Sequence, residues 1–452
     1  MPQPPCPSPE PPVAAVRFGQ ALRFWFWLGC VSFGGPAGQI ALMHQELVVR
    51  RRWISEQRYQ HALHYCMLLP GPEAQQLATY IGWLMHRTAG GIAAGALFVL
   101  PSLLLLIGLS WAYMAWGQHP WGQALLWGLK PAVTALVLQA VHRMALRTLK
   151  RPALWVLAAL SLLATLFGVG FPWLVLAAAL WGWLARPAQA TPATPATHAP
   201  HGQAVEAPAP AEDGAWIGEH SPTPAHARYS PARLLRSSAW GLGLWAASLG
   251  ALVWLFGPQH TLVRMGGFFT EAALLTFGGA YAVLPYVTQA AVSQFGWLSA
   301  AQMMDGLALG ETTPGPLIMV VAFVGFVGGY GQALLGEPLL GGVAAACVVT
   351  WFTFLPSFVF ILAGGPLVES TRHVPALQGP LQAIAAVVIG VMLQLAGSFA
   401  VHTFWPGQQW LQPDGAALAL TLVAAWLLIA RQWPVMRVLA VCVAAGLALQ
   451  AL

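Results

Sequence analysis

A Pro-Gly-Pro sequence at positions 70–72 interrupts a long apolar segment, and the same three residues recur at positions 314–316. Proline removes a backbone amide donor and clashes with the preceding helical turn, while glycine adds backbone freedom. We therefore expect each motif to break a helix into two halves joined by an unwound segment. The alternative is that each motif only kinks a helix so that it fits its neighbours.

The half-helix that follows each break begins with backbone N–H groups that have no partner within the helix. The positive end of the helix dipole points into the same break, so this position favours an anion. Polar side chains flank the two breaks on opposite sides, after the first motif and before the second. The candidate ligands for an anion are Pro70, Gly71, Pro72, Gln75, Gln76, Thr312, Thr313, Pro314, Gly315 and Pro316.

A Phe-Gly-Gly sequence also occurs twice, at positions 33–35 and 277–279. Small residues allow membrane helices to approach closely. Alternatively, paired glycines let the chain turn so that backbone amides face an anion. Pro36 favours a helix break in the first copy, and we expect discontinuous helices at both Phe-Gly-Gly sequences. Both uses stay open for the four glycines, which are Gly34, Gly35, Gly278 and Gly279.

Carboxylates in apolar surroundings are few, and they are Glu46, Glu73, Glu271, Asp305 and Glu311. Ionisable side chains within a membrane are energetically costly and usually functional. Glu73 and Glu311 adjoin the Pro-Gly-Pro breaks, so we predict that one of them carries a coupling proton. The alternative is that each carboxylate only caps a half-helix or pairs with an arginine.

The overall composition indicates the class of protein that carries these motifs. Of the 452 residues, 58% are hydrophobic and 8% are charged, whereas soluble domains contain about 25% charged residues. The apolar runs are continuous and fit helices of about 20 residues, which predicts an all-α membrane protein and not a barrel. The net charge of +6 reflects basic loops beside membrane segments and does not indicate nucleic-acid binding.

Sequence motifs for cofactors, metals and nucleotides are not found. The five cysteines form no CxxC pair, and the histidines near the first repeat, His44, His61 and His64, have no metal-ligand spacing and are expected to serve packing. A Walker A sequence and a dinucleotide fingerprint are also missing, which disfavours ATP-driven pumping. We expect no cofactor, no metal and no catalytic residue.

The chain is expected to divide into four parts: a disordered tail at 1–16, a first membrane repeat at 17–184, a flexible linker rich in Ala, Pro and Thr at 185–235, and a second membrane repeat at 236–452. The apolar run 153–184 is too long for one span, and its central glycines and proline predict a hairpin of two short helices. The linker histidines are expected to be solvated; these are His198, His201, His220 and His226.

A constant offset of 244 residues superposes the two halves of the chain, because it aligns both Phe-Gly-Gly and both Pro-Gly-Pro sequences. Eleven aligned positions are identical: Phe33, Gly34, Gly35, Gln45, Val48, Trp53, Ser55, Leu63, Pro70, Gly71 and Pro72. Further on, FVLPS, which ends at Ser102, aligns with FLPS, which ends at Ser357, after an insertion in the second half. The chain therefore contains an internal duplication.

Basic residues predict how the two repeats are oriented, since Lys and Arg collect on the cytoplasmic side of a membrane. If the broken segments make an even number of crossings, one side holds Arg17, Arg23, Arg87, Arg143, Arg147, Lys150, Arg151, Arg186, Arg228, Arg233 and Arg236. The apolar segment at 237–256 adds one crossing between the repeats. The second repeat is therefore predicted to be inverted relative to the first.

Several long stretches resemble the chromate ion transporter family in its long-chain, two-domain form. They are FGGPAGQIALMHQELV, RRRWISEQRY and HALHYCMLLPGPEAQQLATYIGWL in the first half, and TFGGAYAVLPYV and GWLSAAQMMDGLALGETTPGP in the second. The resemblance maps the family motif onto Gln39 as well as onto the glycines, prolines and polar residues named above. It implies a multi-pass transporter of the bacterial inner membrane that expels chromate, not an enzyme.

Three functions are compared on this basis. Export of chromate, driven by the proton gradient or the membrane potential, is the leading hypothesis, and discontinuous helices in inverted repeats suit it. Chromate and sulfate are both tetrahedral dianions, so the alternative is a carrier of sulfate or another oxyanion in the opposite direction. A membrane-embedded chromate reductase is disfavoured because no cofactor motif is found. The expected partners are the oxyanion, protons and the lipid bilayer; a homodimer stays open.

Overall fold

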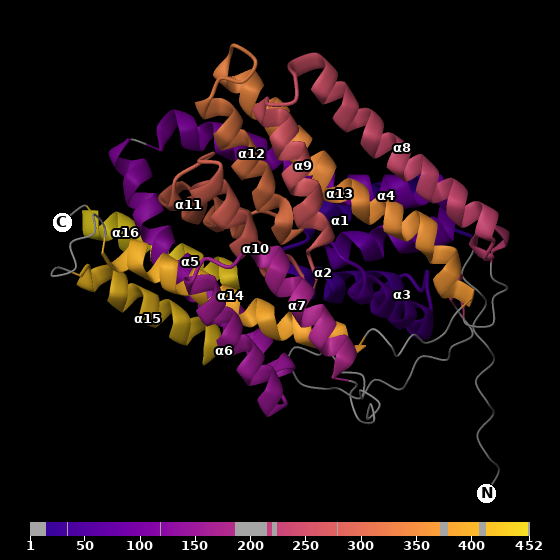
Figure 1. The fold of residues 1–452 in the computed structure, drawn as a ribbon, viewed down its shortest axis with the longest axis horizontal. Coiled ribbons are helices and arrows are strands. Elements are labelled where there is room, and N and C mark those ends of the chain that lie inside the picture. The colour runs from indigo at the N-terminus through magenta and orange to yellow at the C-terminus, as the bar shows by residue number, and fades with distance from the viewer. Residues whose placement is uncertain are drawn as a thin grey trace, which may run out of the picture.

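The computed structural model describes residues 15–33, 35–117, 119–185, 215–218, 224–277, 279–370, 378–405 and 413–450. Within these ranges the secondary structure is helical, apart from one isolated bridge between Ile54 and Ile217. The predicted all-α fold is confirmed. Figure 1 shows the helices as an elongated bundle in which helices from both halves of the chain are intermixed.

The helices fall into two series with the same order. The first series is α1 (Phe18–Val31), α2 (Gly35–His44), η1 (Gln45–Arg50), α3 (Glu56–Leu68), α4 (Glu73–Trp116), α5 (Pro120–Thr148), α6 (Pro152–Leu166) and α7 (Phe171–Leu184). The second is α9 (Thr261–Leu274), α10 (Ala280–Thr288), η4 (Gln289–Gln294), α11 (Ala300–Thr312), η5 (Leu317–Met319), α12 (Val320–Gly331), α13 (Pro338–Ser370), α14 (Gln378–Phe404), α15 (Gly415–Ile429) and α16 (Val435–Gln450). Between the series lie η3 (Ala225–Ala227) and α8 (Pro231–Phe256).

The two series repeat even in local detail. Both contain a short π-helical segment, and η1 and η4 differ in position by the offset of 244 residues. Directly afterwards, α3 and α11 are capped by Ser55 and Ser299, whose hydroxyls accept a hydrogen bond from a backbone N–H in the first helical turn. The duplication that the sequence predicts is therefore present in the fold.

Each repeat contains a helix break at its Phe-Gly-Gly sequence and another at its Pro-Gly-Pro sequence. The Phe-Gly-Gly sequences separate α1 from α2 and α9 from α10, and the Pro-Gly-Pro sequences separate α3 from α4 and α11 from η5. The hairpin predicted in the first repeat is also confirmed: α6 and α7 meet at Gly168, whose φ is +83°. The helix α4 runs from Glu73 to Trp116 and contains a kink with non-helical backbone at His86 and Arg87.

Five described helices are long and apolar enough to cross a membrane: α4, α5, α8, α13 and α14. Shorter apolar helices of 10–17 residues accompany them, including α6, α7, α15 and α16. A short helix spans the hydrocarbon core poorly on its own, because about 20 residues are required. The chain is a multi-pass membrane protein that combines full-length and short segments.

The two repeats interlock by exchanging partners. The long helix α5 of the first repeat packs against α15 and α16 of the second, while α14 of the second packs against α6 and α7 of the first. Figure 1 shows these helices gathered on one side of the molecule. Pairing within a repeat is also matched, since α1 packs on α4 and α9 packs on α13. Such reciprocal packing ties the two halves into one body.

Two short parts of the predicted flexible linker contact the first repeat. The backbone N–H of Trp216 donates to the carbonyl of Arg52 at 3.0 Å, and that of Ser55 donates to Ile217 at 3.0 Å. His226, predicted to be solvated, has Nε2 2.9 Å from the carbonyl oxygen of Trp83. The His226 side chain is partly buried and its ring contacts the Trp83 ring, with centroids 5.3 Å apart, so the expectation is wrong for His226. The other linker histidines lie outside the described residues.

Candidate functional site

The two Pro-Gly-Pro breaks each contact the Phe-Gly-Gly break of the other repeat. The backbone N–H of Gly71 donates to the carbonyl of Thr276 at 2.7 Å, and the N–H of Gly315 donates to the carbonyl of Ser32 at 2.7 Å. Thr276 and Ser32 are themselves related by the offset of 244 residues and directly precede the two Phe-Gly-Gly sequences. The four breaks therefore meet in two reciprocal crossings.

At both crossings, the central glycine cannot be replaced without disruption. Gly71 has a φ of +125° and Gly315 a φ of +109°, which L-amino acids rarely adopt. A Cβ on Gly71 would overlap the hydroxyl of Ser357, and a Cβ on Gly315 would lie against the side chain of Ser102. Each glycine thus brings the backbone of one repeat against a serine of the other.

The second glycine of each Phe-Gly-Gly sequence serves turning and not close packing. Gly35 has a φ of +68° and Gly279 a φ of +98°, and a Cβ on either residue would have no neighbour within 4 Å. Gly34 and Gly278 lie outside the described residues. The close helix approach occurs instead at Gly29, where a Cβ would lie 3.1 Å from the carbonyl oxygen of Phe98.

Three buried glutamine side chains line the crossings. Gln39 donates from Nε2 to the carbonyls of Gly315 and Ser32. On α4, Gln76 Nε2 donates to the Pro70 carbonyl at 2.7 Å and lies 3.4 Å from the Ser357 hydroxyl. Its neighbour Gln75 donates to the Thr79 hydroxyl at 3.0 Å. The structure thus places Gln39 against the second Pro-Gly-Pro motif and Gln76 against the first.

Several buried polar atoms around the crossings have no hydrogen-bond partner in the protein. They are the hydroxyl oxygens of Ser32 and Ser102 and the Oε1 atoms of Gln39, Gln75 and Gln76. All five side chains belong to fully buried residues. An unsatisfied buried polar group costs about 1–3 kcal/mol. A group of them at one place is therefore typical of a site that takes up a polar ligand or water.

The other predicted ligands either bond within their own helix or lie at helix ends. The hydroxyl of Thr312 donates to the carbonyl of Leu309 at 2.8 Å, and that of Thr313 donates to Gly310 at 2.9 Å, so both protons point along α11. Pro36 lies in the first turn of α2. Pro72 and Pro316 are the residues directly before α4 and η5.

The two carboxylates beside the breaks lie within electrostatic range of arginines on one helix. Glu311 accepts a hydrogen bond from the hydroxyl of Tyr281 and lies within electrostatic range of Arg143. Glu73, the first residue of α4, lies within range of Arg147, one turn further along α5. An anion at the crossings would therefore have two carboxylates and two arginines in its surroundings.

The remaining acids in apolar segments have separate partners. Glu46 pairs with Arg50 at 2.5 Å and Arg51 at 3.1 Å, which confirms the arginine-pairing alternative for this residue. Glu271 accepts from Tyr286 at 2.8 Å, and Asp305 accepts from Tyr113 at 3.0 Å. These acids are held at other places in the fold.

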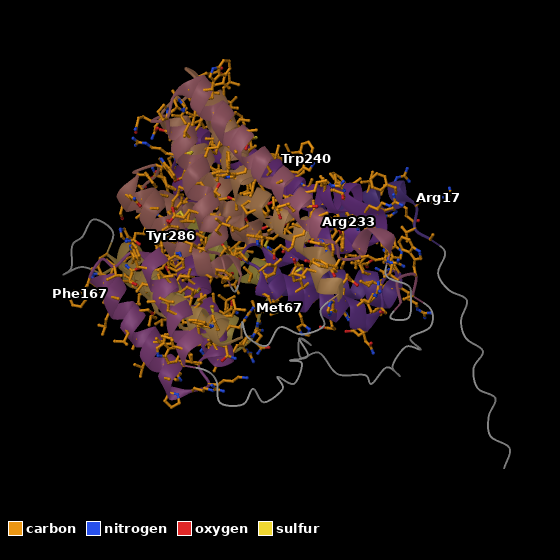
Figure 2. All side chains as sticks on the ribbon, turned by 45° about the vertical axis from the view of Figure 1, so that its right-hand side comes forward. Arg17, Met67, Phe167, Arg233, Trp240 and Tyr286 are labelled. Carbon is orange, nitrogen blue, oxygen red and sulfur yellow. The ribbon has the colours of Figure 1, made fainter. Side chains whose placement is uncertain are left out.

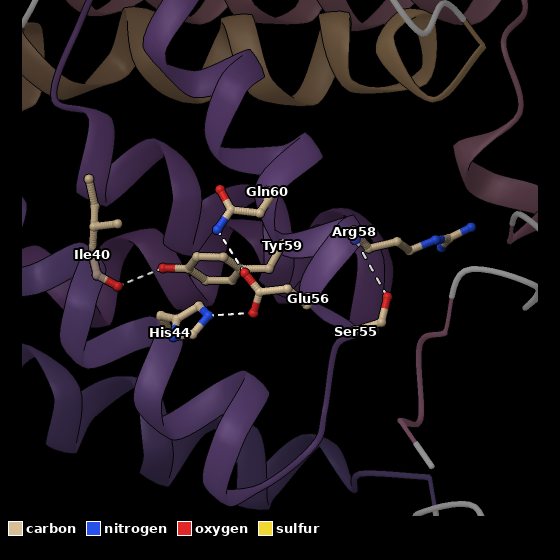
Figure 3. A network of polar contacts seen from close by, with 7 residues as sticks. All are labelled: Ile40, His44, Ser55, Glu56, Arg58, Tyr59 and Gln60. Atoms are coloured by element: carbon tan, nitrogen blue, oxygen red, sulfur yellow. Dashed lines mark hydrogen bonds and ion pairs between the residues drawn. The ribbon is translucent and has the colours of Figure 1, made fainter. Parts of the chain in front are cut away.

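A polar network on the first repeat holds α3, which leads into the Pro-Gly-Pro break (Figure 3). The Tyr59 hydroxyl donates to the carbonyl of Ile40 on α2 at 2.6 Å. Glu56, in the first turn of α3, pairs with His44 and accepts from Gln60 at 2.8 Å. This network fixes α3 against α2, so His44 has the structural role expected of it. Among the described residues, no group of three or more His, Cys, Asp and Glu could hold a metal ion.

Sequence reasoning did not identify the serines and arginines of the site. The alignment of Ser102 with Ser357 was a usable signal, since a polar residue repeated in an apolar motif favours a shared role. Arg143 and Arg147 gave no such signal, because basic residues near helix ends are common in membrane proteins.

Broken apolar helices that cross at a buried polar centre define a multi-pass membrane transporter. The chain belongs to the Chromate transporter family, which it matches over residues 19–183 and 263–448. These two ranges correspond to the two helical series and leave out α8 and the segment before it.

Proteins of similar sequence cover most of the chain. A chromate transport protein of Pseudomonas aeruginosa is 32% identical over 85% of this chain and 80% of its own length. A chromate transport protein of Cupriavidus metallidurans is 27% identical over 85% of this chain and 86% of its own length. A probable chromate transport protein of Synechococcus elongatus is 27% identical over 91% of this chain and 91% of its own length. No solved structure matches the chain.

Proposed function

We propose that the chain exports chromate from the cytoplasm across a bacterial inner membrane and that the oxyanion binds where the four breaks cross. The observation that carries this proposal is the group of buried, unpartnered polar atoms at the reciprocal contacts of Gly71 and Gly315. Backbone N–H groups at the start of α4 and hydroxyls of Ser32 and Ser102 are donors suited to a tetrahedral dianion.

The substrate is inferred from the relatives. Proteins similar to this chain over most of its length are named chromate transport proteins. Sulfate has the same shape and charge, so hydrogen-bond donors alone discriminate poorly between the two oxyanions. Sulfate uptake is therefore the second candidate function.

The two carboxylates are proposed to control access of the anion. An ionised Glu73 at the start of α4 or Glu311 beside the second break repels a dianion, whereas the protonated forms do not. A membrane potential that is negative inside favours outward movement of a dianion by about 4.6 kcal/mol per 100 mV, at about 2.3 kcal/mol per charge. The driving force is thus this potential or the proton gradient.

Alternating access is proposed to use two inverted repeats. The reciprocal packing of α5 and α14 supports a two-fold relation between the repeats. The additional apolar helix α8 between them supports inversion, because one extra crossing places the second repeat in the opposite orientation. Rocking of one repeat against the other would open the crossings to each side in turn.

Flux measurements in inside-out membrane vesicles test this proposal. We expect labelled chromate to accumulate in vesicles that contain the protein when the potential is imposed with the interior positive, and excess sulfate to compete with it. Chromate accumulation that is equal in vesicles lacking the protein would overturn the proposal. Faster movement of sulfate than chromate, in the opposite direction, would favour the second candidate.

A further inference from the structure

An apolar groove runs along the outside of the molecule between α4, α8 and α13. Its volume is about 780 Å³. Leu97 and Leu100 of α4, Trp240 and Leu244 of α8, and Phe354 of α13 form much of its wall. The helix α8 has no counterpart in the first repeat and contains no buried residue. It packs on α13 and α9, so the groove is a feature of this extra helix.

One end of the groove is basic and polar. Arg236 and Ser237, near the start of α8, line the groove together with Thr88 of α4. Arg87 directly precedes Thr88 and has a φ of +58°, outside the helical range. Arg87 and Arg233, one turn before Arg236, both lie within electrostatic range of His226. The arginines of α4 and α8 therefore gather at the same end, and Figure 2 shows Arg233 and Trp240 along the outer edge of α8.

The length of the groove corresponds to one leaflet of a bilayer. Thr88 and Leu103, which line the groove on α4, are separated by roughly 22 Å at the helical rise of about 1.5 Å per residue. A bilayer including its headgroups is about 40–45 Å thick, so one leaflet measures about half of that. The aromatic ring of Trp240, which is 76% exposed, lies one turn from the basic end. Tryptophan prefers this depth, near the headgroups.

We propose that this groove binds one anionic phospholipid, with its phosphate between Arg236 and Arg87 and an acyl chain along α4 and α13. Charge complementarity selects an anionic headgroup over a zwitterionic one. The groove also lies directly behind the candidate site, because Phe358 lines it and would contact a Cβ on Gly95, next to Thr79 and Gln75. The lipid site does not depend on the identity of the transported anion.

Lipid retention by the purified protein tests the proposal. The full chain is titrated in detergent with phosphatidylglycerol or phosphatidylcholine, and bound lipid is counted by native mass spectrometry. We expect the wild type to retain phosphatidylglycerol preferentially. In Arg236→Gln the apparent Kd for phosphatidylglycerol should rise about fivefold, because a basic residue near a membrane surface contributes about 1 kcal/mol. In the double variant with Arg87→Gln the apparent Kd should rise about fivefold once more.

Two further variants keep the result interpretable. Arg437→Gln, on α16, removes a basic residue away from the groove and should leave lipid retention unchanged. Ala96→Trp fills the apolar part of the groove and should reduce retention of phosphatidylglycerol without any change in charge. Equal retention by the wild type and the Arg87/Arg236 double variant overturns the proposal, as does an equal loss in Arg437→Gln. Cross-linking between the Cys347 thiols of two copies would assign the groove to a second chain.

Discussion

The hydrogen bond from Gly71 to Thr276 joins the Pro-Gly-Pro break of the first repeat to the Phe-Gly-Gly break of the second, and it is duplicated by the bond from Gly315 to Ser32 at the same length of 2.7 Å. Breaks in apolar helices expose backbone groups that must be satisfied inside the protein. Here each repeat supplies the partner for the other. The candidate site is therefore a property of the folded pair, not of either repeat.

Replacement of Gly71 by leucine should abolish transport. The positive φ costs a non-glycine residue about 1–3 kcal/mol, and the new side chain would occupy the position of the Ser357 hydroxyl. Chromate flux in vesicles should fall to background while immunoblotting shows normal insertion. Gly250→Leu is the control, because Gly250 on α8 has open space around it. Wild-type flux in Gly71→Leu would exclude this break as part of the pathway.

Loss of the Ser102 hydroxyl should weaken chromate binding. This hydroxyl is buried without a partner beside Gly315, and a hydrogen bond to a charged group contributes about 1.5–3 kcal/mol. We expect Ser102→Ala to raise the KM for chromate about tenfold or more with little change in protein level. Ser110→Ala is a closely matched control, since its hydroxyl is equally buried and unpartnered two turns further along α4. A similar KM in both variants would contradict a ligand role for Ser102.

Arg143 and Arg147 should attract the anion to the crossings. Each lies within electrostatic range of one of the two carboxylates there, so removing its charge leaves the site more negative. We expect Arg143→Gln or Arg147→Gln to raise the KM about tenfold, which corresponds to ~1.4 kcal/mol, and Arg→Lys to restore part of the loss. Arg151→Gln, just beyond the end of α5, should have little effect. Saturation curves for chromate flux provide the measurement, and an unchanged KM in both glutamine variants would be incompatible with this role.

The sequence predicted the duplication and the positions of all four helix breaks, because glycine and proline act through local backbone geometry. It also placed the polar side chains of Gln75 and Gln76 after the first Pro-Gly-Pro break. It could not predict which break meets which, since Gly71–Thr276 and Gly315–Ser32 are contacts between distant segments without a local signal. The docking of His226 on Trp83 was missed for the same reason: Ala- and Pro-rich composition describes the linker as a whole and not the few residues that bind.

Neutralising a carboxylate beside the breaks should remove the dependence of transport on pH. When Glu73 or Glu311 ionises at high pH, its charge opposes the dianion, so the wild-type KM should rise with pH. Glu311→Gln keeps an acceptor for the Tyr281 hydroxyl, and we expect it or Glu73→Gln to flatten this rise and lower the KM at alkaline pH. Glu271→Gln, which has a similar tyrosine partner in Tyr286, should behave as the wild type. Identical pH profiles in all variants would remove both carboxylates from a coupling role.

Docking of the linker on the first repeat should weaken in acid. Burial lowers the pKa of His226 below its ordinary value, with Arg87 and Arg233 adding to the effect despite the bond to Trp83. Free of this contact, the imidazole has a pKa of about 6.5, so the undocked segment binds the proton more readily. The neutral imidazole therefore stabilises the docked linker above about pH 6.5. This stabilisation declines as the pH falls toward the lower pKa that His226 has in the docked state.

Hydrogen exchange of residues 215–218 and 224–230 between pH 7.5 and pH 5.5, corrected for the intrinsic exchange rate, measures this change. We expect protection to decrease with acidification in the wild type. His226→Gln is the matched variant, because glutamine can still donate to the Trp83 carbonyl but does not titrate, and its protection should stay constant over this range. A parallel loss of protection in both proteins would show that a group other than His226 governs the docking.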